Sequence, residues 1–218
     1  RLLLIAPEAS YHTAPFQAAG RRLGIEVIVA SEGRLPVVPG QSVGLRVNFS
    51  NTSRSLRLIE ALYRETPFDG VIGTDDGTLE LATVVATEFG LNTNPPLSTK
   101  ISRRKDRSRV VQRDFGLRTP WFVSAAVCGQ GEPKVPSGVS YPCVAKPVTL
   151  SASRGVIRAN NDQELVAALS RISKIIESAG PEHPRVVLIE EYIPGMEYVV
   201  EGLLNSGNWR TMAIFGKP

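Results

Sequence analysis

The sequence has few of the residues on which disulfide-stapled and metal-bound proteins depend. Its 218 residues include two cysteines, Cys128 and Cys143, and two histidines, His12 and His183. Two cysteines are too few for a secreted disulfide framework, and Cys143 stands in an apolar run where a buried free thiol is the simpler interpretation. We assign neither histidine to a metal, interpret His183 as a loop residue, and expect a cytoplasmic protein.

Long hydrophobic runs and known phosphate-loop signatures are also missing. The opening "RLLLIAPEAS" ends its apolar run at Pro7 and Glu8, which is too short for a signal peptide or a membrane span. The absence of G-x-x-x-x-G-K-[ST] excludes a Walker-type phosphate loop. The formal net charge of +4 suits nucleic acid, an anionic membrane surface or a polyphosphate ligand, and its sign alone does not choose among them.

Strand and helix patterns alternate through residues 1–97. Apolar runs at residues 2–6, 25–31 and 68–73 are typical of strands, and amphipathic or apolar stretches between and after them predict helices, the last closed by Gly90. This alternation predicts an α/β domain with a parallel sheet, helices on both faces and a ligand-facing edge at the carboxyl ends of the strands.

A change of pattern at "LNTNPPLS", residues 91–98, predicts a domain boundary, because paired prolines cannot continue a helix or a central strand. A basic helix over residues 101–116 follows, then a strand from residue 119 and a Gly/Pro-rich connection over residues 129–140. Asn161 and Glu164 fit a capping box at the start of an amphipathic helix, and a hairpin is predicted around residues 205–208.

The stretch "YPCVAKPVTLSASRGV" places a single lysine at the end of an apolar strand. Lys146 is followed by a loop of small residues that includes Ser151, Ser153 and Gly155, whose backbone N–H groups can approach a phosphate closely. The alternative is a turn lysine that extends to water, and this stretch alone does not decide between the two.

A second stretch, "LIEEYIPGMEYVVEG", groups three glutamates around an apolar strand and turn. The carboxylates of Glu190, Glu191 and Glu197 could accept hydrogen bonds from an adenine amino group and ribose hydroxyls. The alternative is that these are glutamates on an exposed sheet edge.

Taken in order, these motifs resemble the ATP-grasp superfamily. "KDRSRVVQRDFGLRTP" looks like the superfamily's first phosphate lysine, Lys105, followed by a helix and a turn. Lys146 with Arg154 and Gly155 matches the second lysine and its phosphate-covering loop, and "EEYIPGMEY" resembles the adenine hinge. The carboxylate-amine ligases, including amino-acid ligases that make dipeptides, are the most similar branch.

The resemblance implies a fold, a domain order and an activity. It implies an α/β chain with a pre-ATP-grasp parallel-sheet domain over residues 1–97, an ATP-grasp α+β subdomain over residues 98–189, and a hinge with the start of a second, truncated subdomain over residues 190–218. Relatives activate a carboxylate as an acyl phosphate with ATP and Mg²⁺ and then couple it to an amine. We therefore expect ATP, Mg²⁺, a small carboxylate and an amine, most simply an amino acid, as ligands, and neither nucleic acid nor membrane as partner.

The resemblance also assigns individual residues to the nucleotide. Glu190 is expected toward the adenine amino group, the backbone of Glu191 and Ile193 on the ring edge, and Glu197 on the ribose. The full set of expected nucleotide-binding residues is Lys105, Lys146, Ser151, Ser153, Arg154, Gly155, Glu190, Glu191, Tyr192, Ile193 and Glu197. Catalytic and metal-binding residues are expected beyond Pro218, so we expect the chain alone to be inactive. The oligomeric state is open, with a homodimer among the options.

Several other residues have structural interpretations that we prefer over functional ones. Asp75 and Asp76 follow a strand where they could face substrate or metal, but a helix cap is the favoured role for one of them. Ser10, Tyr11 and His12 could be substrate neighbours. Three aromatic residues are assigned to the core: Trp121, Phe122 and Trp209. Four arginines are assigned to a solvated helix face: Arg103, Arg104, Arg107 and Arg109.

Two other functions compete with a carboxylate-amine ligase. One is another ATP-grasp branch, purine-biosynthetic or similar to biotin carboxylase. The other is a non-catalytic module that binds nucleotides or nucleic acid, which the basic charge suggests although no base-reading motif is visible.

Overall fold

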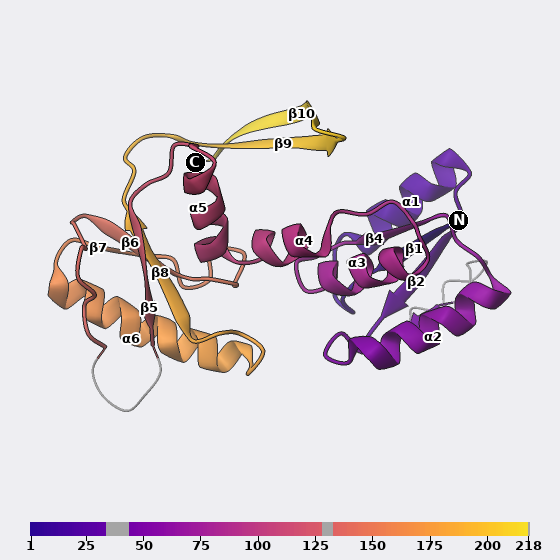
Figure 1. The fold of residues 1–218 in the computed structure, drawn as a ribbon, viewed down its shortest axis with the longest axis horizontal. Helices are drawn as coiled ribbons and strands as arrows, with labels where there is room; N and C mark the ends of the chain where they lie inside the picture. Colours follow the sequence, from indigo (N-terminus) through magenta and orange to yellow (C-terminus); the bar gives the residue numbers. More distant parts are fainter. Residues whose placement is uncertain (34–43, 128–132, 218) are drawn as a thin grey trace. The chain divides into compact units, whose positions relative to one another are not determined.

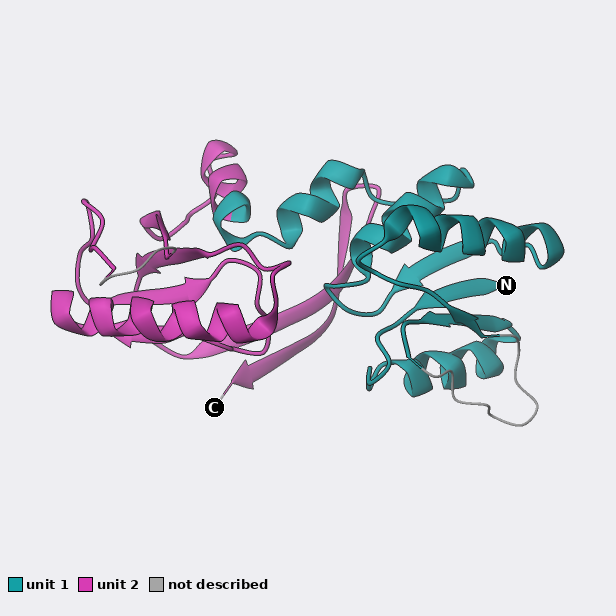
Figure 2. Cartoon of the chain, turned by 90° about the horizontal axis from the view of Figure 1, so that it is seen from below, with its two compact units in different colours: residues 1–108 teal, residues 109–218 magenta. Residues whose placement is uncertain are grey.

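The computed structural model describes residues 1–33, 44–127 and 133–217. The chain divides into two compact units, residues 1–108 and 109–218, which have separate colours in Figure 2. Cys128, Pro218 and the beginning of the Gly/Pro-rich connection lie outside the described residues. In the described ranges no helix is both long and apolar enough to cross a membrane.

The first unit contains a four-stranded parallel sheet in the order β3-β2-β1-β4 (Figure 1). The strands are β1 (Leu2–Ile5), β2 (Val27–Ser31), β3 (Leu45–Arg46) and β4 (Gly70–Gly73). In β1, Leu3, Leu4 and Ile5 are fully buried, as expected for a central strand covered on both faces. The predicted α/β architecture of this half of the chain is confirmed.

Helices cover both faces of this sheet (Figure 2). They are α1 (Thr13–Leu23), α2 (Thr52–Glu65) and α3 (Leu79–Glu88). Helix α4 (Pro96–Ser102) packs on α3 instead, where Thr99 lies 3.0 Å from Thr83. The Asn51 side chain caps α2 by accepting a hydrogen bond from the Arg54 N–H at 3.0 Å. The apolar faces of α2 and α3 pack on the strands, with Ile59 and Val85 fully buried in the shared core.

The second unit contains an antiparallel sheet in the order β5-β8-β6-β7. Its strands are β5 (Phe122–Ala126), β6 (Cys143–Pro147), β7 (Ile157–Ala159) and β8 (Val186–Glu191). Helix α6 (Asp162–Ala179) covers one face of the sheet, and its residues Leu165, Leu169 and Ile172 are fully buried there. The predicted cap of α6 is confirmed, because the Asn161 side chain accepts from the Glu164 N–H at 2.9 Å.

The unit ends in a hairpin of β9 (Glu197–Asn205) and β10 (Asn208–Lys217). Its two-residue turn, Ser206 and Gly207, has positive φ at both positions, the geometry that matches the twist of two antiparallel strands. The predicted hairpin is therefore confirmed. Placing Trp209 in the core was wrong, because its position in this hairpin leaves it 54% exposed.

The predicted basic helix over residues 101–116 is two helices. Helix α4 ends at Ser102, and α5 runs over Lys105–Asp114. Between them, Arg104 binds both carboxylate oxygens of Asp106, at 2.9 and 2.6 Å. This local ion pair accompanies the break, which helical periodicity alone does not reveal.

Candidate functional site

One face of the second unit's sheet is packed on α6, and the other carries charged side chains. Strand alternation turns Cys143 and Ala145 toward the helix, so Val144 and Lys146 point to the opposite face. Val144 lies opposite Glu190 on β8, and Lys146 lies opposite Leu188. Lys146 and Glu190 are therefore diagonal neighbours on one face, close enough for their long side chains to meet.

The centre of this face is a carboxylate bound by two cations. The Lys146 ammonium donates a hydrogen bond to Oε1 of Glu190, and the Arg109 guanidinium donates through Nε to Oε2 at 3.0 Å. The side chains of Glu190, Lys146 and Arg109 are 9%, 16% and 27% exposed. We call these three residues the Glu190 cluster.

The cluster keeps its carboxylate ionised. Burial raises the pKa of the Glu190 carboxyl, but hydrogen bonds from Arg109 and Lys146 and the charges of both groups outweigh burial, so the pKa lies below its ordinary value. One carboxylate faces two cations, which leaves the cluster with a net positive charge. A positive, largely enclosed group of side chains can accept a further anion.

Arg109 was missed by the sequence analysis, which placed it on a solvated helix face. Its side chain instead binds Glu190 and also donates to Oε1 of Gln112 at 2.9 Å. Arg103 and Arg104 are likewise paired, with Glu80 and Asp106. The spacing of Arg109 and Gln112 on α5, three residues apart on one helical face, was the signal that could have indicated a shared contact.

The loop after Lys146 has an anchored base and an exposed tip. Val148 and Leu150 are buried, and the Thr149 hydroxyl lies 3.0 Å from Nδ1 of His183. Ser151, Ser153 and Arg154 at the tip are exposed. Their side chains and backbone are accessible to a ligand, while the base of the loop remains fixed to the sheet.

The backbone at this tip is unusual. Ala152, Ser153 and Gly155 have φ values of 54°, 57° and 76°, and side-chain-bearing residues seldom adopt this left-handed region. A Cβ on Gly155 would also lie 3.0 Å from the ring of Pro147. Glycine is therefore favoured at position 155 by both conformation and space.

The predicted adenine hinge joins β8 to β9. The Glu191 N–H donates to the Trp121 carbonyl at 3.1 Å, and the Tyr192 N–H donates to the Pro142 carbonyl at 3.3 Å. Within the described residues, the Ile193 N–H has no hydrogen-bond acceptor, and its side chain is 67% exposed. The hinge thus has a fixed beginning and an available donor at Ile193.

Two further features of the hinge concern its side chains. The Arg158 guanidinium lies 4.2 Å from the centroid of the Tyr192 ring, a cation–π arrangement. Glu197 is exposed and pairs with Lys217 at 2.9 Å. Since Glu197 is exposed, its carboxylate can exchange this surface partner for another at little cost.

Lys105 and the substrate candidates belong to the first unit. Lys105 is the first residue of α5, and its assignment to a phosphate stays a prediction. A helix cap was predicted for one of Asp75 and Asp76, and this was wrong, because α3 begins without a side-chain cap. The Asp75 carboxylate instead accepts hydrogen bonds from Ser10 at 2.8 Å and Thr74 at 2.5 Å. Ser10, Thr74 and Asp75 form a polar cluster beyond β1 and β4, at the carboxyl edge of the sheet.

The described residues hold no evident metal centre. In residues 1–33, 44–127 and 133–217, no group of three or more His, Cys, Asp or Glu side chains could hold a metal ion. The site therefore consists of groups that form hydrogen bonds and ion pairs. Among them, the cations of the Glu190 cluster and the Ile193 N–H suit an anionic ligand that also accepts hydrogen bonds.

Sequence comparison finds relatives over most of the chain. Residues 139–218 match the family model of an ATP-grasp domain. The chain is 28% identical over 209 residues to a D-alanine--D-alanine ligase of Legionella pneumophila, covering 90% of this chain and 53% of that protein. It is 27% identical over 179 residues to a formate-dependent phosphoribosylglycinamide formyltransferase of Thioalkalivibrio sulfidiphilus, covering 79% and 42%. The chain thus spans about half the length of the curated relatives it matches.

Comparison with solved structures finds proteins with the same fold as this chain. An L-amino acid ligase from Bacillus licheniformis superposes with a TM-score of 0.78 and 22% sequence identity, over 100% of this chain and 50% of that one. A D-alanine--D-alanine ligase from Bacillus anthracis superposes over 100% of this chain with a TM-score of 0.59 and 15% identity. The mixed architecture of parallel and antiparallel sheets therefore matches that of ATP-grasp structures.

Proposed function

The chain belongs to the ATP-grasp superfamily, and on this premise we propose that it is the nucleotide-binding part of an ATP-dependent ligase that joins a carboxylate to an amine. The observation that supports this function is the Glu190 cluster. Its lysine, Lys146, is largely enclosed at the end of a strand and beside an exposed loop, and the cluster carries a net positive charge. Amino acids are the proposed substrates. In the whole protein, the substrate carboxylate takes the γ-phosphoryl group of ATP, and the amine then displaces inorganic phosphate to give an amide.

The residues present suit a nucleotide. Lys146 supplies a charge for the phosphates, and the exposed tip formed by Ser151, Ser153, Arg154 and Gly155 supplies hydroxyl, guanidinium and backbone donors near the same strand end. At the hinge, Ile193 offers an N–H to a ring nitrogen and Glu197 a carboxylate to ribose hydroxyls. ATP, when bound, supplies the phosphoryl group, and these residues bind and orient it.

Arg109 lowers the free-energy cost of moving Lys146 from Glu190 to a phosphate. The two cations bind different oxygens of Glu190 as their shortest contacts, so Arg109 can keep the carboxylate compensated when Lys146 turns to another anion. Without a second cation, moving Lys146 away would leave the buried Glu190 carboxylate uncompensated, so the lysine would stay paired with it. We therefore include Arg109 as a positioning residue of the site.

Mg²⁺ remains part of the proposal through the phosphates. ATP-dependent phosphoryl transfer uses a divalent cation to neutralise the β- and γ-phosphate oxygens. The described residues offer no cluster of three acidic or histidine ligands, so no step is assigned to a metal held by them.

Nucleotide binding tests the site assignment directly. We expect Lys146→Met to weaken binding of ATP to the chain by about tenfold or more, the effect of one lost charge-assisted contact, as measured by isothermal titration calorimetry. Lys174→Met is the matched control, because Lys174 is an exposed lysine of α6 in the same unit. Equal affinities of the Lys146 variant and the wild type would refute the assignment.

A second candidate is a purine-biosynthetic ligase. The chain is nearly as similar to the formyltransferase relative as to the D-alanine--D-alanine ligase, at 27% and 28% identity. ADP release by the whole protein, measured with a panel of amino acids and with glycinamide ribonucleotide, separates the two. Turnover with the ribonucleotide alone would replace the leading proposal.

A further inference from the structure

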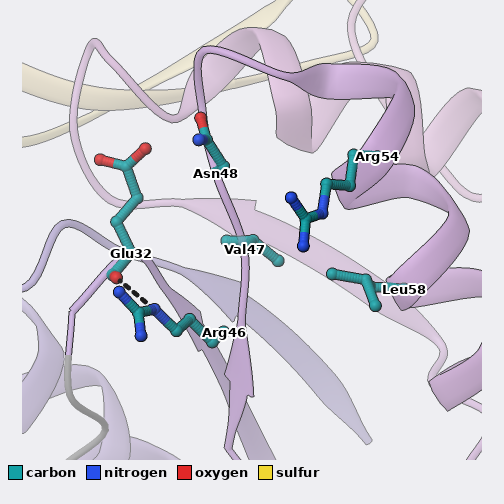
Figure 3. A pocket seen from close by; sticks show the side chains of 6 residues that line it. All are labelled: Glu32, Arg46, Val47, Asn48, Arg54 and Leu58. Atoms are coloured by element: carbon teal, nitrogen blue, oxygen red, sulfur yellow. Dashed lines mark hydrogen bonds between the residues drawn. The ribbon is translucent and has the colours of Figure 1, made fainter.

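A pocket in the first unit is lined by none of the residues assigned to the nucleotide. It has a volume of about 440 Å³, within the range of small-molecule sites. Its lining consists of Glu32, Arg46, Val47, Asn48, Arg54 and Leu58 (Figure 3). These residues follow β2, end β3 and begin α2, so the pocket lies at the carboxyl ends of two parallel strands, where ligands of open α/β sheets bind.

Two guanidinium groups share this pocket without a carboxylate partner. Arg46 donates through Nε to the backbone carbonyl of Glu32 at 3.2 Å, the contact drawn as a dashed line in Figure 3, and this leaves its terminal nitrogens available. Figure 3 shows the Arg54 side chain extending from α2 toward Val47. Among the described residues, neither arginine forms an ion pair. The two guanidinium groups outweigh the single carboxylate of the lining, that of Glu32, so the pocket favours an anionic ligand.

The other polar groups of the pocket favour hydroxyl groups. Oε1 of Glu32 accepts from the Phe49 N–H at 2.6 Å, which fixes the carboxylate and leaves Oε2 as an acceptor. Oδ1 of Asn48 accepts from the Ser50 N–H at 2.8 Å, so its amide nitrogen is the group left to donate. Val47 and Leu58 contribute apolar surface. The pocket therefore has a cationic side and a hydrogen-bonding side.

We propose that this pocket binds a small phosphomonoester that also carries hydroxyl groups. A phosphomonoester has a charge of about −1.5 to −2 at pH 7, which matches two guanidinium groups, and its oxygens accept the bidentate contacts that arginine makes. The hydroxyl groups donate to Glu32 and accept from Asn48. This inference does not depend on the proposed ligase activity, because none of the pocket residues belongs to the nucleotide site.

The test measures binding of glycerol 3-phosphate to the chain by calorimetry, with glycerol and acetate as uncharged and carboxylate comparators. We expect saturable binding of glycerol 3-phosphate, and Arg54→Gln and Arg46→Gln each to weaken it by about tenfold. Arg57→Gln is the matched control, since Arg57 is an exposed arginine of the same helix that does not line the pocket. Thermal unfolding of each variant establishes that the fold is kept.

Two further variants separate this pocket from the nucleotide site. Lys146→Met should leave glycerol 3-phosphate binding unchanged, whereas Glu32→Gln should weaken glycerol 3-phosphate more than inorganic phosphate. Binding that survives both arginine substitutions, or that is lost in the Lys146 variant, overturns the proposal. So does a preference for acetate, or the lack of saturable binding.

Discussion

Replacing Glu190 with glutamine should destabilise the second unit more than any substitution of a neighbouring surface glutamate. The change removes one negative charge at nearly constant volume and leaves Lys146 and Arg109 facing each other across a neutral amide. Both cations are largely enclosed, at 16% and 27% exposure, so water compensates them only in part. The variant thus converts a stabilising ion cluster into a pair of like charges.

The size of the effect follows from burial. Removing one member of a buried ion pair costs about 3–5 kcal/mol, and the partial exposure of both cations places this case near the lower value, about 3 kcal/mol. Arg109→Met should cost less, about 1.5 kcal/mol, because the Lys146–Glu190 pair remains and only hydrogen bonds to a charged group are lost. We therefore expect Glu190→Gln to lower the free energy of unfolding more than Arg109→Met does.

Tryptophan fluorescence during urea unfolding measures this cost in one unit alone. The sequence contains two tryptophans, Trp121 and Trp209, and both belong to the second unit. A Trp209→Phe background leaves Trp121, which packs against the sheet core, as the single reporter. Glu191→Gln is the control, since Glu191 is exposed on the same strand. If Glu190→Gln lowers the free energy of unfolding no more than this control, the reasoning about the cluster is wrong.

Three other substitutions or conditions have predictable effects. Gly155→Ala should lower the free energy of unfolding by about 1–2 kcal/mol in the same assay, because alanine is strained at φ 76° and its Cβ would press on Pro147; an unchanged midpoint would contradict this. Asn161→Ala should cost about 1 kcal/mol through loss of the α6 cap, whereas Gln163→Ala on the exposed face should cost almost nothing. Because the pKa of Glu190 is lowered by folding, its contribution to stability is complete above the unfolded-state pKa and is lost as the pH falls through the folded-state pKa. Urea midpoints between about pH 6 and pH 3 should therefore decline less in Glu190→Gln than in the wild type.

The sequence predicted the helices, strands and turns that depend on residues close together in the chain. A run of apolar residues specified β1, the Asn161 side chain specified the start of α6, and a turn with Gly207 specified the hairpin. Each depends on residues within a few positions of one another. Strand β3 was not predicted, because its two residues are too few to show alternation.

The candidate site was predictable only in part for the same reason. Lys146 and the loop after it could be found because the strand end and the small residues adjoin in sequence. The partner of Arg109 is 81 positions away, and no periodicity within α5 identifies a carboxylate on β8. Trp209 was misplaced because an aromatic residue in a strand pattern does not show whether anything covers that strand.

The geometry of the Glu190 cluster also bears on how a phosphate would be admitted. A lysine paired only with a buried carboxylate would have to break that pair before meeting a second anion, and the carboxylate would then be left without compensation. Here Arg109 makes its 3.0 Å contact with Oε2 while Lys146 uses Oε1. When Lys146 turns outward, Glu190 keeps a guanidinium partner, so the cost is one hydrogen bond rather than an isolated buried charge. Arg109→Met should therefore weaken ATP binding through its effect on Lys146, and adding Glu190→Gln to Arg109→Met should restore part of the lost affinity. Calorimetry on the two variants would decide this, and a double variant that binds no better than Arg109→Met would refute this account of Arg109.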